Sequence, residues 1–198
     1  TGPICKKSWA LANHNYTGQT ELLAESCQSK NVGMLFTAKS PITNWRFNTL
    51  LATTHIPLCE VPKKLSTKLI HSKLDLLSEF SKNFVKNPLL QVAGLNPHAG
   101  EEGILGNEEK NWINEAVNIW INQNKGVQLL GPISPDTCWN SSAKAWREKT
   151  APTHDGILAM YHDQGLIPIK VIALNYSVNT TIGLPFIRTS PDHGTGFD

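Results

Sequence analysis

Helical and strand patterns alternate along this chain, and that alternation limits the folds open to it. The residue patterns typical of strands occupy 32–36, 48–53, 89–95, 127–130, 157–161, 167–174 and 178–182. Helical spacing of apolar residues separates most of these segments, so we predict α/β layers with at least part of the sheet parallel. The last two segments follow one another without a full helix, which predicts a mixed sheet or a hairpin arm there.

Two of the intervening segments predict helices with defined starts. The first begins at 66–67 and places Ile70, Leu74 and Leu77 on one stripe. The second begins at 107–109, where acidic residues in the first turn suit the positive end of the helix dipole. Both helices therefore have an apolar face to pack against the predicted sheet.

Charge and composition exclude several classes of protein. Lys+Arg 18 against Asp+Glu 16 gives a net charge of +2, which is too balanced for a nucleic-acid or polybasic membrane surface. No apolar run approaches the ~18 residues that a membrane span needs, and no signal peptide is visible. We expect a cytoplasmic protein that binds neither nucleic acid nor membrane. Its four cysteines form no C-x-x-C pair and are expected to be reduced, buried or half-buried thiols.

Histidines stand just after three of the predicted strands. His55, His98 and His162 each lie in a turn bounded by glycine or proline. Ligands of open α/β sheets bind beyond the carboxyl ends of strands, and neutral imidazole is the commonest metal ligand. Three protein ligands with one open position make a catalytic metal site. A single strand-end histidine is more often a hydrogen-bonded structural residue, so metal binding and a structural role both stay open here.

The C-terminal part of the chain offers groups that suit an anion. Lys170, Asn179 and Arg188 lie on or after predicted strands in largely apolar surroundings. Such cations indicate a carboxylate or phosphate ligand, while ordinary ion pairs are the alternative. Residues 192–198 form a glycine-rich polar turn suited to a ligand or a domain junction.

Six motifs in a fixed order point to a family. They are TTHIPL at 53–58, GLNPHAGE at 94–101, GPISPDT at 131–137, AMYHDQG at 159–165, GLPFIRTS at 183–190 and DHGT at 192–195. Together they resemble the 4-hydroxythreonine-4-phosphate dehydrogenase family of pyridoxine and pyridoxal phosphate biosynthesis, and the resemblance spans almost the entire chain.

The resemblance implies a fold, an activity and an assembly. The fold is the three-layer α/β/α type of isocitrate and isopropylmalate dehydrogenases, with a mixed sheet. The activity is oxidation of 4-phosphohydroxy-L-threonine by NAD or NADP to a 3-oxo acid, which loses CO2 to give 3-amino-2-oxopropyl phosphate. The assembly is a homodimer whose active site lies in an interdomain cleft at the dimer interface.

The resemblance also implies roles for individual residues. A divalent metal (Zn, Mg or Co) is held by His55, His98 and His162, the last supplied by the partner subunit. Lys170 joins these histidines among the catalytic residues. The substrate contacts are implied at Gln19, Thr20, Lys170, Asn179 and Arg188, and weaker cofactor candidates are Asp192, His193 and Thr195.

One departure from the family pattern keeps the substrate open. Gln19 stands where the family usually has histidine, and an amide neither carries positive charge nor shuttles a proton at neutral pH. A first alternative is therefore a dehydrogenase of a related phosphorylated hydroxy acid, such as threonate or erythronate 4-phosphate. A second is a non-catalytic metal- or phosphate-binding α/β domain.

The resemblance finally implies a partial chain. Residues 1–16 are expected to be a remnant or junction of a first domain, 17–188 the main α/β domain with the metal and substrate residues, and 189–198 the junction back. We expect residues 1–198 alone to dimerise poorly and to have little or no dehydrogenase activity.

Overall fold

A computed structural model describes residues 5–14, 16, 18–151 and 153–190 of the chain. The cofactor candidates Asp192, His193 and Thr195 lie outside the described residues. Among those described, no helix is both long and apolar enough to cross a lipid bilayer.

The centre of the molecule is a mixed seven-stranded sheet in the order β4-β3-β5-β2-β1-β6-β7. The neighbours β2/β5, β5/β3 and β3/β4 are parallel, whereas β1 pairs antiparallel with β2 and β6, and β7 with β6. The strands are β1 Gly33–Lys39, β2 Arg46–Leu51, β3 Leu89–Ala93, β4 Gln128–Ile133, β5 Gly156–Ala159, β6 Ser177–Ile182 and β7 Arg188–Ser190. The predicted α/β fold with a mixed sheet is confirmed.

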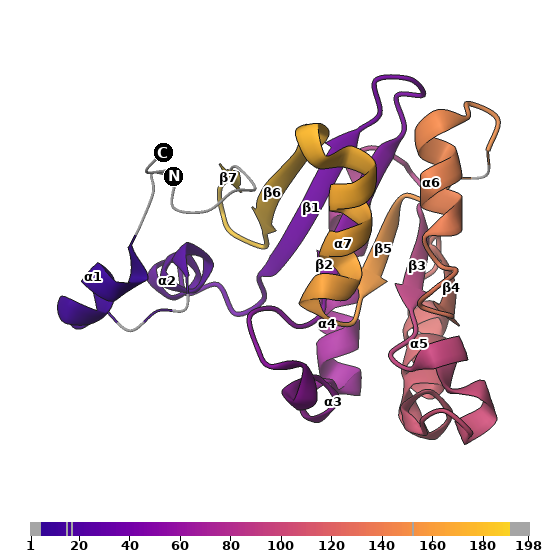
Figure 1. Cartoon of the computed structure of the whole chain (residues 1–198), viewed down its shortest axis with the longest axis horizontal. Helices are drawn as coiled ribbons and strands as arrows, with labels where there is room; N and C mark the ends of the chain where they lie inside the picture. Colours follow the sequence, from indigo (N-terminus) through magenta and orange to yellow (C-terminus); the bar gives the residue numbers. More distant parts are fainter. Residues whose placement is uncertain (1–4, 15, 17, 152, 191–198) are drawn as a thin grey trace.

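Helices cover both faces of this sheet, which makes three layers (Figure 1). One buried apolar cluster lies under α4 and α5, and a second lies under α6 and α7. In Figure 1, α1 and α2 lie beside the β6–β7 edge, away from the other helices. The α-helices are α1 Lys6–Leu11, α2 Gln19–Ser26, α3 Val61–Lys64, α4 Thr67–Lys82, α5 Asn114–Gln123, α6 Asn140–Arg147 and α7 His162–Ala173. Shorter turns are η1 Leu58–Glu60, η2 Pro97–Gly103, the π-helical η3 Glu109–Ile113 and η4 Leu174–Tyr176.

Helix α4 forms where the sequence predicts it. The Ser66 hydroxyl accepts a hydrogen bond from the Leu69 N–H at 3.3 Å and so caps the first turn. Ile70, Leu74 and Leu77 are fully buried on its inner face. The predicted helix from 107–109 also exists, but it begins as the π-helical turn η3 before α5 continues it.

The prediction of a strand at 167–174 is wrong, because this segment lies mostly in helix α7. Leu166, Ile169 and Ala173 are buried against the sheet at helical spacing. Ile167 and Val171 lie between them in sequence and are 62% and 80% exposed. Because α7 is apolar on its outer face as well, its helical periodicity is hidden in the sequence.

The cysteines are free thiols, as expected, but they differ in exposure. Cys138 is buried, and burial raises its pKa to about 12. Cys59 in η1 is exposed, which corrects the expectation that all the thiols are at least half buried.

Candidate active site

One edge of the sheet collects most of the polar turns predicted as site segments. The parallel strands β2, β5 and β3 end at this edge. Strand β6 also ends there and β7 begins there, because two successive antiparallel pairings bring β6 parallel to β2. The segments that carry His55, His98, His162 and Arg188 therefore all leave or enter the sheet on one side.

His55 and His162 lie together at this edge. Their ring centroids are 5.4 Å apart, and the rings are tilted by 47°. The Thr53 hydroxyl donates to the Met160 carbonyl at 2.8 Å and ties the turn after β2 to the turn after β5. The histidines line a pocket of about 180 Å³ together with Thr53, Thr54, Ile56, Leu58, Val61, Tyr161 and Asp163.

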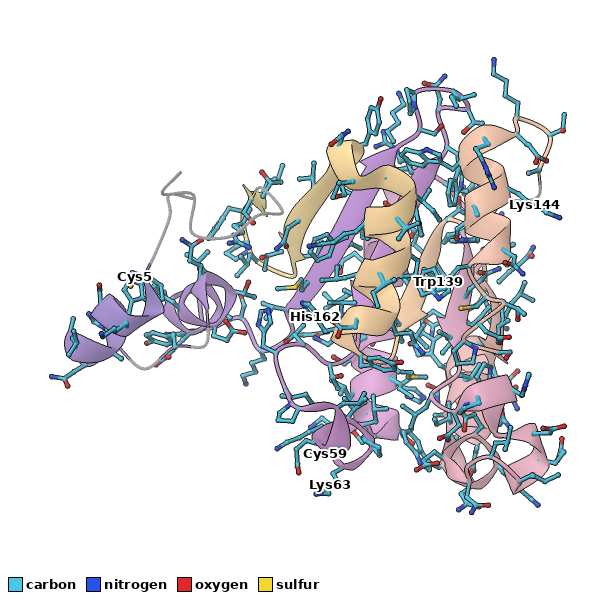
Figure 2. The ribbon with its side chains drawn as sticks, viewed as in Figure 1. Cys5, Cys59, Lys63, Trp139, Lys144 and His162 are labelled. Atoms are coloured by element: carbon cyan, nitrogen blue, oxygen red, sulfur yellow. The ribbon has the colours of Figure 1, made fainter. Side chains whose placement is uncertain are left out.

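His162 is oriented by a neighbouring carboxylate. It is the first residue of α7, and Figure 2 shows it at the lower end of that helix. Its Nδ1 lies 2.7 Å from Asp163 Oδ1. A hydrogen bond donated by Nδ1 leaves Nε2 as the atom able to accept a proton or bind a metal.

His98 follows β3 on the turn η2 and is exposed. Its φ of 52° lies in the left-handed region. It is near enough to Asp136 to favour the charged carboxylate, although the Ser134 hydroxyl, which donates to Asp136 at 2.5 Å, is the main cause of the lowered Asp136 pKa. His98 therefore belongs to the same edge, on the β3 and β4 side of the other two histidines.

Within one chain the histidines are not yet a complete metal site. Among the described residues, no three His, Cys, Asp or Glu side chains gather closely enough to hold an ion. The structure brings His55 and His162 together and does not bring His98 into a set of three with them. A two-histidine set leaves positions for further ligands, such as a side chain from a second subunit or water.

The predicted substrate residues Gln19, Thr20 and Arg188 lie together at the β6–β7 end. Arg188 donates from Nη2 to Gln19 Oε1 at 2.9 Å and from Nη1 to Thr181 Oγ1 at 3.0 Å. The Thr20 and Thr181 hydroxyls are 3.4 Å apart. These contacts join the start of α2 to β6 and β7.

Arg188 is a positively charged side chain that is largely buried. The residue is only 8% exposed, and burial lowers its pKa, an effect opposed by the nearby Glu21 carboxylate. A guanidinium stays charged in proteins, so this position presents a fixed positive charge. Such a buried, hydrogen-bonded cation can bind a phosphate or carboxylate.

Asn179 lies on β6 beside this cluster, and Lys170 lies on α7, which covers the same face of the sheet. Asn179 and Thr181 lie opposite Phe36 and Met34 of β1, whose side chains pack under α7. The buried Asn179 Oδ1 accepts no hydrogen bond within the described part of the chain. Lys170 is in the last turn of α7, about 12 Å along the helix axis from His162, and not on a strand as predicted.

Sequence reasoning missed Thr181 and Asp163. Thr181 contacts both Thr20 and Arg188, and its alternation with Asn179 along β6 could have indicated that the two side chains share a face. Asp163 directly follows His162 and orients its ring, but a carboxylate in the first turn of a helix is common enough to carry little signal.

Comparison with known proteins identifies the family of this chain. The family model described as "Pyridoxal phosphate biosynthetic protein PdxA" matches residues 1–198. Proteins named 4-hydroxythreonine-4-phosphate dehydrogenase from Synechococcus sp. (strain RCC307) and Synechocystis sp. are 54% and 51% identical over 100% of this chain. The chain covers 61% and 58% of those relatives, so it spans about three fifths of their length.

Solved structures give the same result. The crystal structure of 4-hydroxythreonine-4-phosphate dehydrogenase from Klebsiella pneumoniae superimposes with a TM-score of 0.82 at 37% identity. The match covers 100% of this chain and 56% of that one. With the family model matched from end to end, this chain belongs to the PdxA family of pyridoxal phosphate biosynthetic proteins.

Proposed function

We propose that the full protein carrying this chain is a divalent-metal-dependent NAD(P) dehydrogenase of 4-phosphohydroxy-L-threonine in pyridoxal phosphate biosynthesis. The product is a 3-oxo acid that decarboxylates to 3-amino-2-oxopropyl phosphate. The names of the relatives support the reaction. The observation that carries the proposal is that the turns bearing His55, His98 and His162 gather at the same edge of the sheet as the Arg188 cluster.

The residues present fit a divalent metal ion. His55 and His162 offer two imidazoles on adjacent strand ends, and Asp163 fixes one ring with Nε2 left to bind. The proposed site consists of His55 and His98 of one subunit with His162 of the partner subunit, and the chain's own His162 is proposed to serve the partner's site. When bound, a divalent ion supplies Lewis-acid polarisation of the alcohol oxygen and stabilisation of the charge that develops there on decarboxylation.

The chain's own cations bind and orient the substrate. Arg188 is held by Gln19 and Thr181 and presents a fixed guanidinium to a phosphate or carboxylate. We assign Lys170 to the same anionic groups and Asn179 to a substrate hydrogen bond, since its buried Oδ1 can accept one. NAD or NADP accepts the hydride, and Asp192, His193 and Thr195 are proposed to contact it.

A homodimer with a shared site is part of the proposal. The outer face of α7 exposes Ile167, Val171 and Leu174 at 62%, 80% and 62%. Their spacing makes one apolar stripe, and a contiguous apolar stripe on an exposed helix indicates a protein interface. Because α7 also carries His162 and Lys170, an interface along it would bring site residues of one subunit close to the other.

Gln19, where the family usually has histidine, keeps a second substrate open. Gln19 accepts a hydrogen bond from Arg188 and is neutral, so it adds no positive charge to the cluster. A related substrate such as threonate or erythronate 4-phosphate differs from 4-phosphohydroxy-L-threonine at its amino group. We therefore keep the dehydrogenase of such a sugar-acid phosphate as the alternative function.

The test uses the full-length protein with NAD or NADP and either Zn²⁺, Mg²⁺ or Co²⁺. Addition of 4-phosphohydroxy-L-threonine is expected to produce the NADH or NADPH absorbance band, and His55→Ala is expected to abolish it. A parallel assay with the two sugar-acid phosphates discriminates the alternative substrate. Absence of reduced cofactor with every metal and substrate would contradict the proposed function.

A further inference from the structure

The turn that carries His98 has an unusual backbone. His98, Ala99, Glu101 and Glu102 have φ values of 52°, 51°, 42° and 54°, and Gly100 between them has 82°. Side chains with a Cβ disfavour this left-handed region, and successive residues rarely occupy it. A backbone of this kind persists only where its surroundings determine it, and such segments concentrate at functional sites.

A buried carboxylate holds the residues just before this turn. Glu109 is 1% exposed at the start of η3. Its Oε1 accepts the Leu95 N–H at 2.6 Å and the Asn96 N–H at 2.8 Å, and its Oε2 accepts Asn96 Nδ2 at 2.7 Å. One side chain thus fixes two successive backbone groups that lead directly into Pro97 and His98.

The turn also packs directly on this carboxylate. A Cβ added at Gly100 would lie 3.0 Å from Glu109 Oε2 and 2.7 Å from the Gly106 carbonyl. Only a residue without a side chain permits that approach, so the left-handed turn rests on the group that anchors its start. No lysine or arginine forms a salt bridge with Glu109 in the described part of the chain, and its charge is satisfied by N–H donors.

A second buried side chain connects this turn to the His162 turn. Gln164 accepts the Met160 N–H at 2.6 Å and donates to the Gly94 carbonyl at 2.8 Å. Gly94 immediately precedes the groups held by Glu109. The two histidine-bearing turns therefore share one buried network of backbone hydrogen bonds.

We propose that Glu109 is a positioning residue, which sets the direction of the His98 imidazole by holding the Leu95–Asn96 backbone and the left-handed turn. This inference rests on the proposed metal-dependent function. Glu109 does not contact the metal or the substrate in it. Its effect on metal binding passes through the backbone that carries His98. Because its removal also leaves buried N–H groups without an acceptor, a loss of stability is expected beside the loss of metal affinity.

The test measures Zn²⁺ binding to the full-length protein by isothermal titration calorimetry, without substrate. Glu109→Ala is expected to weaken binding about 10- to 100-fold, the usual effect of removing a group that orients a metal ligand. Glu109→Gln keeps an acceptor for the two backbone N–H groups and is expected to lose less. Amide hydrogen exchange at Leu95 and Asn96 is expected to quicken in the order of the affinity loss.

A matched control separates positioning from general destabilisation. Ser142→Ala removes the buried hydrogen bond to His154 Nε2 at 2.8 Å, and is expected to lower the melting temperature without changing Zn²⁺ affinity. Glu109→Gln is expected to need a higher metal concentration for half-maximal dehydrogenase activity. At saturating metal its kcat is expected to equal that of the unaltered protein.

The outcomes are distinguishable. Unchanged Zn²⁺ affinity in a folded Glu109→Ala protein would overturn the positioning role alone. If the alanine variant does not fold, unchanged affinity in Glu109→Gln despite faster exchange at Leu95 and Asn96 would overturn it. An equal loss of affinity in Ser142→Ala would make the effect a general one and would also overturn it. Failure of the unaltered protein to bind Zn²⁺ would overturn the metal proposal together with this inference.

Discussion

The two faces of the sheet are built for different purposes. Under α4 and α5 the side chains form one closed apolar cluster, with Leu74, Leu77 and Trp120 almost fully buried. Under α6 and α7 the sheet is covered by a second apolar cluster. The outer side of α7, however, exposes an apolar stripe, and the Arg188 cluster lies at the β6–β7 end of this face of the sheet. The first face holds the sheet together, whereas the second leaves surface and charge for other molecules.

The largest expected effect on stability comes from a substitution on the face of the sheet that is covered by α4 and α5. Leu77 is fully buried, and Leu77→Ala should lower the free energy of unfolding by about 2–5 kcal/mol through lost apolar burial and the cavity left behind. Urea denaturation of the full-length protein measures it. Leu174→Ala is the matched control at protein concentrations low enough to dissociate the subunits. Leu174 at the end of the outer stripe is 62% exposed in the single chain, so its loss should then change stability by less than about 1 kcal/mol. Equal losses would mean that the two faces do not differ.

The α6 side contains a buried titratable group and should make stability depend on pH. His154 is almost fully buried, contacts Ser142 Oγ through Nε2, and lies edge-on to Trp45. Burial lowers its pKa to about 4, so the folded state favours the neutral ring while the unfolded chain titrates near 6.5.

The unfolded state therefore binds more protons between about pH 6.5 and pH 4. The stability that His154 contributes should be complete above pH 6.5 and fall by about 3 kcal/mol as the pH drops toward 4. Urea denaturation at several pH values in this range measures the effect. The free energy of unfolding should depend less on pH in His154→Gln than in the unaltered protein. A slope unchanged by that substitution would assign the pH dependence to other groups.

The helices on the two faces of the sheet differ in how well the sequence predicts them. The α4 helix could be predicted with its cap and its stripe, because one side is apolar and the other polar. The sequence predicts a strand in place of helix α7 because Ile167 and Val171 are apolar on its outer side, and no local rule distinguishes an exposed apolar residue from a core residue. Tertiary packing on Met34 and Phe36 decides the helix, and that contact is not local in sequence.

The site shows the same division. His55 and His162 could be predicted as neighbours, since each follows a strand and parallel strands end together. Glu109 and Gln164 could not, because each acts on the backbone of residues far away in the chain, and a buried carboxylate or amide leaves no periodic pattern. What stays a prediction is the complete metal site, in which the partner's His162 joins His55 and His98.

On the face covered by α6 and α7, Arg188→Lys should weaken substrate binding strongly and lower the free energy of unfolding only slightly. Lysine keeps the charge but cannot donate to Gln19 and Thr181 in the same fork geometry. Loss of one charged hydrogen bond, about 1.5–3 kcal/mol, corresponds to a KM about 10- to 100-fold higher, with a stability loss of about 1 kcal/mol. Arg46→Lys is the control, because Arg46 stacks on Phe84 away from this cluster. An unchanged KM in Arg188→Lys would remove Arg188 from the substrate site.

The smallest effect on the folded subunit is expected on the outer stripe itself, where the effect on assembly should be largest. Val171 is 80% exposed, so Val171→Glu should change the free energy of unfolding of the subunit by no more than about 0.5 kcal/mol. A carboxylate in the middle of the stripe should nevertheless prevent association, since burying an unpaired charge at an interface is strongly unfavourable. Sedimentation velocity of the full-length protein should then show a monomer, where the unaltered protein is expected to form the proposed dimer. Ile42→Glu, at an exposed aliphatic residue in the β1–β2 turn, should leave the dimer intact.

If Val171→Glu still dimerises, the stripe is not the subunit interface. The proposed supply of His162 by the partner subunit would then need a different geometry.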